Sequence, residues 1–351
     1  MTLRCEELYF SLPSTFCLFN GPGLHIWEAR APEEPVQRSQ ETVSSMISDR
    51  SFSSISQPFV LVEDIQLGMC ASQADIWQYS EEIQSSLEHD INSLIRQKSL
   101  REGLNSWKRL FDQTSIEDSE PAMQGMTNKI PMKYYYGVED HSEVGWQEVV
   151  LNRPQGLLFD TAMLYHLFGL HIHANIRIFE TLASSKKDSR IATGGDGILG
   201  KEHRTRRWTN VVCSRQAIWH ASNIVAIHRS RFGRLTGQIK VVNESLDPIA
   251  HVAVAVGSLV VWAYCYFNEK GCAQCIGPAG ISVEVELMDI LTKNEDSEKW
   301  IELGGLATID GHTLCRCNVE KLVQVFQDCL PSGVQKWDMA DTLSGVLNKT
   351  V

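Results

Sequence analysis

The sequence predicts an all-α fold, and three stretches carry that prediction. Residues 206–267 contain two apolar patterns with helical spacing, separated by a polar turn. Residues 155–182 form another long apolar pattern of this kind. Between residues 73 and 98, large apolar side chains recur at spacings of three, four and seven, as on one face of an amphipathic helix. We therefore expect a helix-dominated chain with roughly seven or eight helices and little strand.

The chain is predicted to consist of an N-terminal arm and one helical domain. Residues 1–60 begin with bulky apolar side chains interrupted by turn formers. Residues 31–58 are rich in Ser, Glu, Gln and Pro, which is typical of a mobile linker or a surface loop. We expect an extended arm over residues 1–60 and a single helical domain over residues 61–350.

The first helices of the domain are expected over residues 73–98. Ser72 and Asp75 have the spacing of a capping box, in which a hydroxyl and a carboxylate accept from the free backbone N–H groups of a helix start. Residues 112–145 are polar, with Gly and Pro, and predict a long loop anchored by three tyrosines at 134–136.

A long central helix is expected next. Pro154 suits its first turn, where the missing N–H costs nothing, and the apolar pattern continues to Leu182. Gly169 within it permits close packing or a kink. Residues 184–203 are polar and glycine-rich, and predict a loop.

Two helices are expected over residues 206–267, and the other helices are expected to pack around them. Its first helix places an apolar stripe on one face, formed by Trp208, Val211, Val212, Ile218 and Trp219 together with Arg215 and Ser222. Its second helix follows Asp247 as N-cap and Pro248 at the first helical position. Residues 249–267 hold no Asp, Glu, Lys or Arg, but their uninterrupted apolar part is about 16 residues, short of a bilayer span. A buried core helix is favoured over a membrane span.

The remaining elements are shorter. Residues 282–291 alternate enough for a strand or a short helix. Residues 318–330 predict a helix with Asn318 as its cap, and residues 336–347 predict a last helix.

Charge and cysteine content restrict the class of protein. The net charge of -11 makes the chain as a whole a poor nucleic-acid binder, and its richest basic run, residues 201–207, is short. The 10 cysteines are scattered, unlike those of a dense secreted disulfide scaffold. Glu6 and Glu7 stand where the apolar run of a signal peptide would begin. We expect a reducing, intracellular compartment and free thiols.

Two motifs have more ordinary explanations than the chemistry they suggest. Gly195, Gly197 and Gly200 match a dinucleotide-binding fingerprint, but no apolar strand precedes them, so a flexible loop is expected. The histidines at 166, 171 and 173 are not at zinc-helix spacing, so hydrogen bonding in the core or between helices is favoured. The motifs of serine hydrolases and zinc metalloproteases are absent, and we predict that the chain is not an enzyme.

The best candidate for a metal site is a set of four cysteines. Cys272 and Cys275 have a spacing that suits one zinc ion, and Cys315 and Cys317, near His312, offer a second pair. Cysteine is also a small core residue, and the spacing of Cys315 and Cys317 is unusual for zinc. Metal binding is therefore the weaker alternative, and no cofactor is expected in this chain.

Several strings of residues resemble the fungal-specific transcription factor domain, the regulatory region of fungal activators that carry paired zinc fingers. They are RW at 207–208, SRQAIWHA at 214–221 and VWAY at 261–264, with further stretches at 11–20, 26–30, 67–78, 157–177 and 337–347. The resemblance covers residues from about 8 to 347 and consists of packing residues, so it bears more on the fold than on chemistry.

The resemblance implies an α-helical regulatory domain of a nuclear transcription regulator, often one that controls metabolic or secondary-metabolite genes. Such proteins carry zinc in an N-terminal DNA-binding module, and this chain has neither the six-cysteine cluster nor the zinc-finger pair. We therefore expect protein partners in the transcription machinery, self-association into a homodimer, DNA contact only through a missing or partner module, and no membrane. The alternative is a small-molecule sensor or an uncharacterised enzyme with a pocket between the long helices, near His166 and His171.

Overall fold

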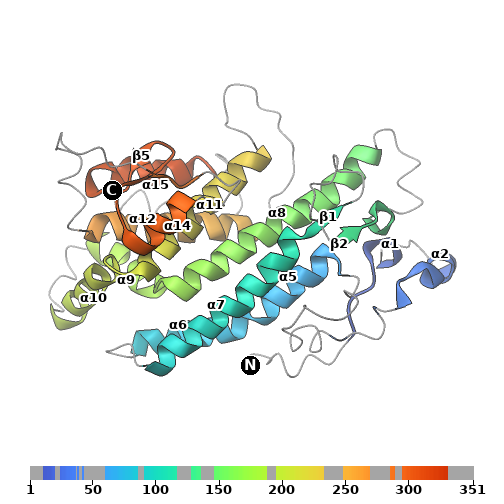
Figure 1. Ribbon diagram of the computed structural model, residues 1–351, viewed down its shortest axis with the longest axis horizontal. Helices are drawn as coiled ribbons and strands as arrows, with labels where there is room; N and C mark the ends of the chain where they lie inside the picture. Colours follow the sequence, from blue (N-terminus) through green and yellow to red (C-terminus); the bar gives the residue numbers. More distant parts are fainter. Residues whose placement is uncertain are drawn as a thin grey trace. The chain divides into compact units, whose positions relative to one another are not determined.

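A computed structural model describes most of the chain, and its elements are labelled in Figure 1. The described residues are 11–19, 24–36, 38, 42, 60–85, 91–116, 128–135, 146–187, 195–232, 248–268, 285–288 and 295–330. They are mostly helical, at 81%, with more helices than the seven or eight predicted and with short strands. The chain divides into two compact units, which are described separately: unit 1 holds residues 1–79 and 89–165, and unit 2 holds residues 80–88 and 166–351.

Unit 1 contains two helices within or overlapping the predicted amphipathic region of residues 73–98, and one helix that precedes it. Helix α5 is Val62–Ala71, α6 is Gln73–Ser85 and α7 is Ile91–Asp112. Helices α5 and α7 pack against each other, and Gly68 permits it, since a Cβ there would overlap the ring of Trp107. The predicted capping box is not formed by the Ser72 hydroxyl, which donates to the Gly68 carbonyl instead. Helix α5 has the cap contact that the sequence did not predict: the Leu61 N–H donates to Asp64 Oδ2 at 2.8 Å.

The predicted loop over residues 112–145 contains short ordered pieces. Strands β1 (Thr114–Ile116) and β2 (Asn128–Ile130) pair in parallel, and a 3₁₀ turn, η3, spans Met132–Tyr135. The expected tyrosine anchor is confirmed for Tyr135, which joins Leu61, Val62 and Ile130 in a buried apolar cluster. Tyr136 lies outside the described residues.

The described part of the arm also belongs to unit 1. It contains helix α1 (Phe16–Phe19), helix α2 (Leu24–Arg30) and the 3₁₀ turn η2 (Ala31–Glu33), so these parts of the arm are helical and not extended as predicted. An isolated antiparallel bridge joins Ser11 to Thr42. The structure does not test the predicted boundary between the arm and the helical domain at residue 60, so this boundary stays a prediction.

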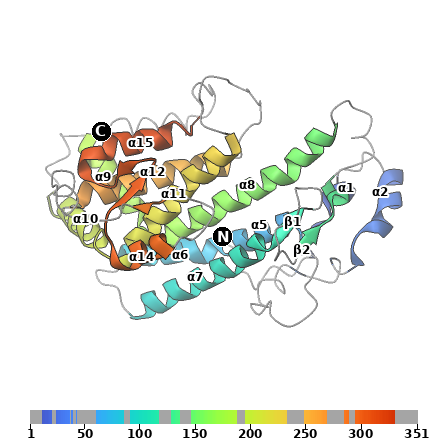
Figure 2. The same cartoon turned by 45° about the horizontal axis from the view of Figure 1, so that its top comes forward.

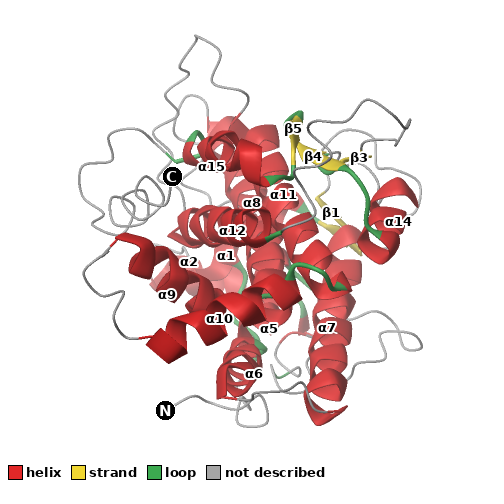
Figure 3. Cartoon of the chain, turned by 90° about the vertical axis from the view of Figure 1, so that its left-hand side faces the viewer, coloured by secondary structure: helices red, strands yellow, loops and turns green. Residues whose placement is uncertain are grey.

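Unit 2 is organised around α12 (Pro248–Phe267), which contacts α9 (Ile176–Lys187), α10 (Gly195–Trp208), α11 (Val212–Phe232) and α15 (Val319–Gln327). Figure 3 shows α12 between α15 on one side and α9 and α10 on the other. Helix α14 (Glu295–Leu303) packs on α11. A contiguous stretch of α12, Gly257–Cys265, is buried throughout, which is why its sequence is apolar on every side.

Helix α12 has the length and composition of a membrane span, but its surroundings are those of a core helix. Within its most apolar window, 72% of the residues are buried inside the protein. Its start at Pro248 agrees with the prediction, and Asp247 lies outside the described residues. The packing supports the expectation of a buried core helix.

A small sheet in unit 2 qualifies the all-α prediction. Strand β3 (Val285–Glu286) is parallel to β4 (Ala307–Ile309), which is antiparallel to β5 (His312–Thr313). Asp310 and Gly311 turn the chain with φ of 54° and 72°, and their backbone N–H groups donate to the Glu286 carboxylate. Of the two alternatives predicted for residues 282–291, a strand or a short helix, the described residues 285–288 contain a strand.

Four predicted boundaries are wrong. The single central helix predicted over residues 155–182 is two helices, because α8 ends at His173 and α9 begins at Ile176. Residues 195–203 are helical and open α10, so the glycines at 195, 197 and 200 lie in a helix and not in a flexible loop. Pro154 is not at a helix start, because α8 runs Trp146–His173 and includes it. The first helix of the central pair is interrupted after Trp208, and α11 begins at Val212. The predicted helix over residues 336–347 lies outside the described residues.

Candidate functional site

A cluster of imidazole and indole rings lies between the end of α8 and the middle of α11, in unit 2. The Nδ1 atoms of His166 and His220 are 3.1 Å apart, and both side chains are buried. His173, one turn further along α8 from Gly169, stacks on His220 with ring centroids 5.7 Å apart. Trp219 completes the cluster, 5.4 Å from His166 and 4.9 Å from His220.

The geometry of the histidine pair restricts its protonation. A contact between two Nδ1 atoms requires one imidazole to donate and the other to accept. If both rings carried two protons, two N–H groups would face each other without an acceptor. The pair is therefore suited to share a proton and to join α8 to α11 by a hydrogen bond. The predicted interhelical role of His166 is confirmed, and His220 is the partner that the sequence did not identify.

Gly169 brings the two helices together at this cluster. A Cβ at position 169 would overlap the imidazole of His220, so only glycine fits. The expectation that Gly169 permits close packing is confirmed. Because the ring of His220 occupies the space against the α8 backbone, this position offers no room for a ligand between the two helices.

The four predicted metal-ligand cysteines are only partly described. Cys272 and Cys275 lie outside the described residues. Cys315 is buried and Cys317 is exposed, so the two thiols sit in different environments. Across the part of the chain that the structure describes, no group of three or more His, Cys, Asp or Glu side chains is placed to hold a metal ion. The four-cysteine set stays a prediction.

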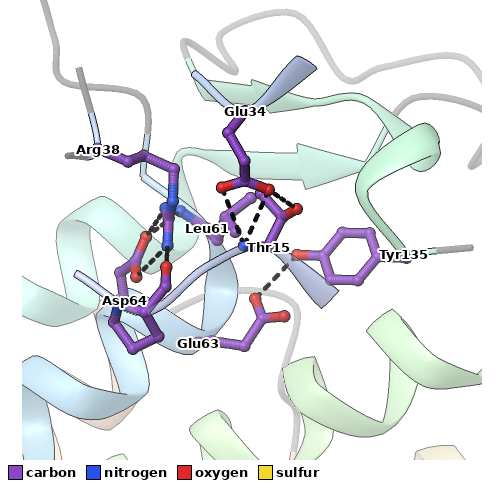
Figure 4. A network of polar contacts seen from close by, with 8 residues as sticks. Thr15, Glu34, Arg38, Leu61, Glu63, Asp64 and Tyr135 are labelled. Carbon is purple, nitrogen blue, oxygen red and sulfur yellow. Dashed lines mark hydrogen bonds and ion pairs between the residues drawn. The ribbon is translucent and has the colours of Figure 1, made fainter. Parts of the chain in front are cut away.

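A second polar centre lies in unit 1, where the arm meets α5 (Figure 4). Arg38 and Asp64, exposed by only 3% and 0%, form a bidentate ion pair in which Nη2 and Oδ1 are 3.0 Å apart. Arg38 Nη2 also donates to the Pro13 carbonyl at 2.6 Å. The guanidinium thus connects two parts of the arm to the start of α5.

Neighbouring contacts extend this network. Both Glu34 carboxylate oxygens accept from the Thr15 backbone N–H at 3.2 Å, and one also accepts from the Thr15 hydroxyl. The Tyr135 hydroxyl donates to Glu63 at 3.2 Å, and burial raises the pKa of the Glu63 carboxyl. Beside the network is a small open pocket lined by Thr15, Cys17, Leu18, Arg30, Glu33, Glu34, Lys133 and Tyr134.

The sequence did not predict the centre in unit 1. Arg38 stands in a stretch whose composition is that of a linker, and composition does not reveal which single cation is buried. One signal was present: Asp64 follows a run of apolar residues at the expected start of the domain. A carboxylate in that position needs either exposure or a partner.

Comparisons with known proteins find no counterpart. No family model, no curated protein and no solved structure matches the chain.

The buried His228 and the half-buried His171 of unit 2 make this unit sensitive to acid. Burial lowers the pKa of His171 to about 4, and burial together with His251 and Arg229 lowers the pKa of His228 to about 4. In the unfolded chain both titrate near 6.5, so the unfolded state binds more protons between about pH 6.5 and 4. We expect the free energy of unfolding to fall by about 2 kcal/mol per histidine between pH 7 and 5, as measured by urea denaturation.

The matched control is the double variant His171→Gln/His228→Gln, which removes both titrations. Its stability should depend less on pH than that of the parent over the same window. Glu63, whose pKa is raised, acts in the opposite direction and is present in both proteins. Parallel pH profiles of parent and variant would contradict the prediction.

Proposed function

We propose that this chain is the regulatory domain of a nuclear transcription regulator, of the fungal-specific transcription factor type, and that it acts through protein contacts. One observation carries the proposal: the RW, SRQAIWHA and VWAY strings lie on three helices of unit 2, α10, α11 and α12, and α12 contacts the other two. The stretches at 11–20, 26–30 and 67–78 belong to unit 1, so the proposal rests on these three strings.

The contacts of Trp208 support this reading. Its indole N–H donates to the His173 carbonyl at the end of α8, at 2.9 Å. Its ring lies 4.8 Å from Phe179 in α9 and 6.3 Å from Tyr264 in α12. One side chain of the RW string therefore joins three other helices, including the VWAY segment.

The SRQAIWHA string has a similar role. Ser214, Ala217, Ile218 and His220 are buried on the inner side of α11. Arg215 holds the end of α14, since its Nε donates to the Ile301 carbonyl at 2.6 Å and its Nη2 to that of Glu302 at 2.8 Å. The string orders packing on two sides of α11, which favours a structural signature over a catalytic one.

The charge distribution favours protein partners over direct base readout. The net charge is -11, and backbone phosphates repel such a chain. In the short basic run on α10, Arg206 already lies 3.9 Å from Glu202. DNA recognition and zinc would then belong to a separate module or to a partner protein.

A tethering assay tests the proposed function. The full chain is fused to a heterologous DNA-binding module with its own nuclear-import signal, and is tested on a silent reporter and on an active reporter. We expect transcription from at least one reporter to change several-fold relative to the DNA-binding module alone. The direction of the change distinguishes an activator from a repressor.

The matched control is the Gly169→Leu fusion, whose side chain collides with His220 and should disrupt unit 2. It should lose the effect at equal protein abundance. A folded, nuclear parent fusion that leaves both reporters unchanged would refute the proposal.

A further inference from the structure

Four large apolar side chains of the described arm of unit 1 are exposed, whereas Leu12 and Leu18 of the same arm are buried. Phe19, Leu24, Trp27 and Val36 are exposed by 82%, 71%, 46% and 71%. Thr15, Arg30 and Arg38 are buried beneath the same segment. Single exposed apolar residues are ordinary on a protein surface, but several on one short segment form a patch, and exposed apolar patches mark interaction sites.

The outward side of the arm is also acidic. Leu24, Trp27 and Glu28 are at spacings of three and four, and therefore share one face of α2. Glu28 and Glu33 are exposed, whereas the two arginines of the described arm are buried. We name as the arm face the residues Phe19, Leu24, Trp27, Glu28, Glu33 and Val36.

The first half of α7 has the complementary character. Ile91, Leu94, Ile95 and Lys98 share a helix face, and the apolar three are exposed by 76%, 52% and 63%. No residue from 91 to 103 in α7 is buried. Residues 91–102 contain three basic side chains and one acidic one, and Lys98 is 67% exposed. We name as the α7 face the residues Ile91, Leu94, Ile95, Lys98 and Arg101.

These two faces do not cover each other within one chain. Both belong to unit 1, and Figures 1 and 2 place α2 and the Ile91 end of α7 at opposite ends of that unit. Each face is apolar at its centre, and their charges are opposite. We propose that the arm face of one copy of this chain docks on the α7 face of a second copy.

A reciprocal arrangement suits the size of these faces. A stable interface buries about 800 Å² on each partner, more than a helix as short as α2 provides. In a two-fold dimer the contact is made twice, because each copy offers its arm face to the α7 face of the other. Opposite charges at the edges of each contact fix the pairing and disfavour arm-to-arm contact.

Charge reversal with mixing tests the interface on the full chain. Sedimentation velocity is expected to show dimers for the parent. Glu28→Lys/Glu33→Lys makes both faces basic, and Lys98→Glu/Arg101→Glu makes both acidic, so each variant alone should dimerise about tenfold or more weakly. Mixing the two variants pairs a basic arm face with an acidic α7 face, and an acidic arm face with a basic α7 face, and should restore dimers.

The control is Glu302→Lys/Glu320→Lys, which changes the net charge as the arm variant does but at exposed positions of unit 2. It should dimerise like the parent, and far-UV circular dichroism should show that all variants fold. A parent that is monomeric up to about 100 µM, or variants that stay monomeric when mixed, would overturn the interface. The proposed function is independent of this result, because a monomeric domain can still change transcription in the tethering assay.

Discussion

Replacement of Trp262 by alanine is expected to lower the free energy of unfolding by about 3–5 kcal/mol. Among the described residues, Trp262 is the largest of the fully buried side chains, and it is exposed by 0%. Its ring stacks on Tyr266 at 5.6 Å and meets Phe267 edge-on at 5.9 Å. Alanine removes these contacts and leaves a cavity in the core of unit 2, next to α12.

Urea denaturation followed by far-UV circular dichroism measures this loss. Trp77→Ala is the matched control, because Trp77 is exposed by 44% and its loss should cost less than about 1 kcal/mol. The two units need not unfold together, so a denaturation curve with two transitions is fitted with a separate free energy of unfolding for each unit. If Trp262→Ala is no more destabilising than Trp77→Ala, the central placement of Trp262 is wrong.

Breaking the ion pair between Arg38 and Asp64 is expected to have a similar effect in unit 1. Replacement of Arg38 by methionine leaves the Asp64 carboxylate buried without its cation, which costs about 3–5 kcal/mol when the partner is fully enclosed. Asp64→Leu leaves the guanidinium in the same situation and also removes the cap contact to the Leu61 N–H. Both single variants should therefore be strongly destabilised.

The double variant Arg38→Met/Asp64→Leu separates the charge effect from general loss of packing. With both charges gone, no buried ion is left unpaired, so the double variant should be more stable than the sum of the two single effects implies. The Arg109→Met variant is the matched control, because it makes the same substitution at an exposed arginine of unit 1, whose Nη2 donates to the Ser106 hydroxyl at 3.1 Å. Strict additivity of the two single variants would show that the pair does not act as a unit.

The helices of unit 2 with strong periodicity could be predicted from the sequence, and those that depend on tertiary contacts could not. Helix α12 begins at the predicted proline, and α15 follows the predicted N-cap Asn318, although the Asn318 side chain donates to the Thr313 carbonyl instead of capping. Helix α10 was missed because three glycines near its start lower helix propensity. It is held by the burial of Thr205 and by the contacts of Trp208, which become visible only in the folded protein.

Strands and polar pairs were the least predictable features. Strands of two or three residues are too short for an alternating pattern to be distinguished from a loop. The His166–His220 pair joins residues 54 positions apart, and the Arg38–Asp64 pair joins residues 26 apart. Local sequence does not specify such partners, so the spacing of the histidines excluded a zinc helix but did not identify His220.

The contact between Gly169 and His220 has a consequence for how this protein can vary. The imidazole fills the volume that any side chain at position 169 would need. A larger residue at 169 is compatible with the same helix crossing only when residue 220 becomes smaller, and such a change also removes the partner of His166. Positions 169 and 220 are therefore expected to change together, and a change at 220 also alters the surroundings of His166.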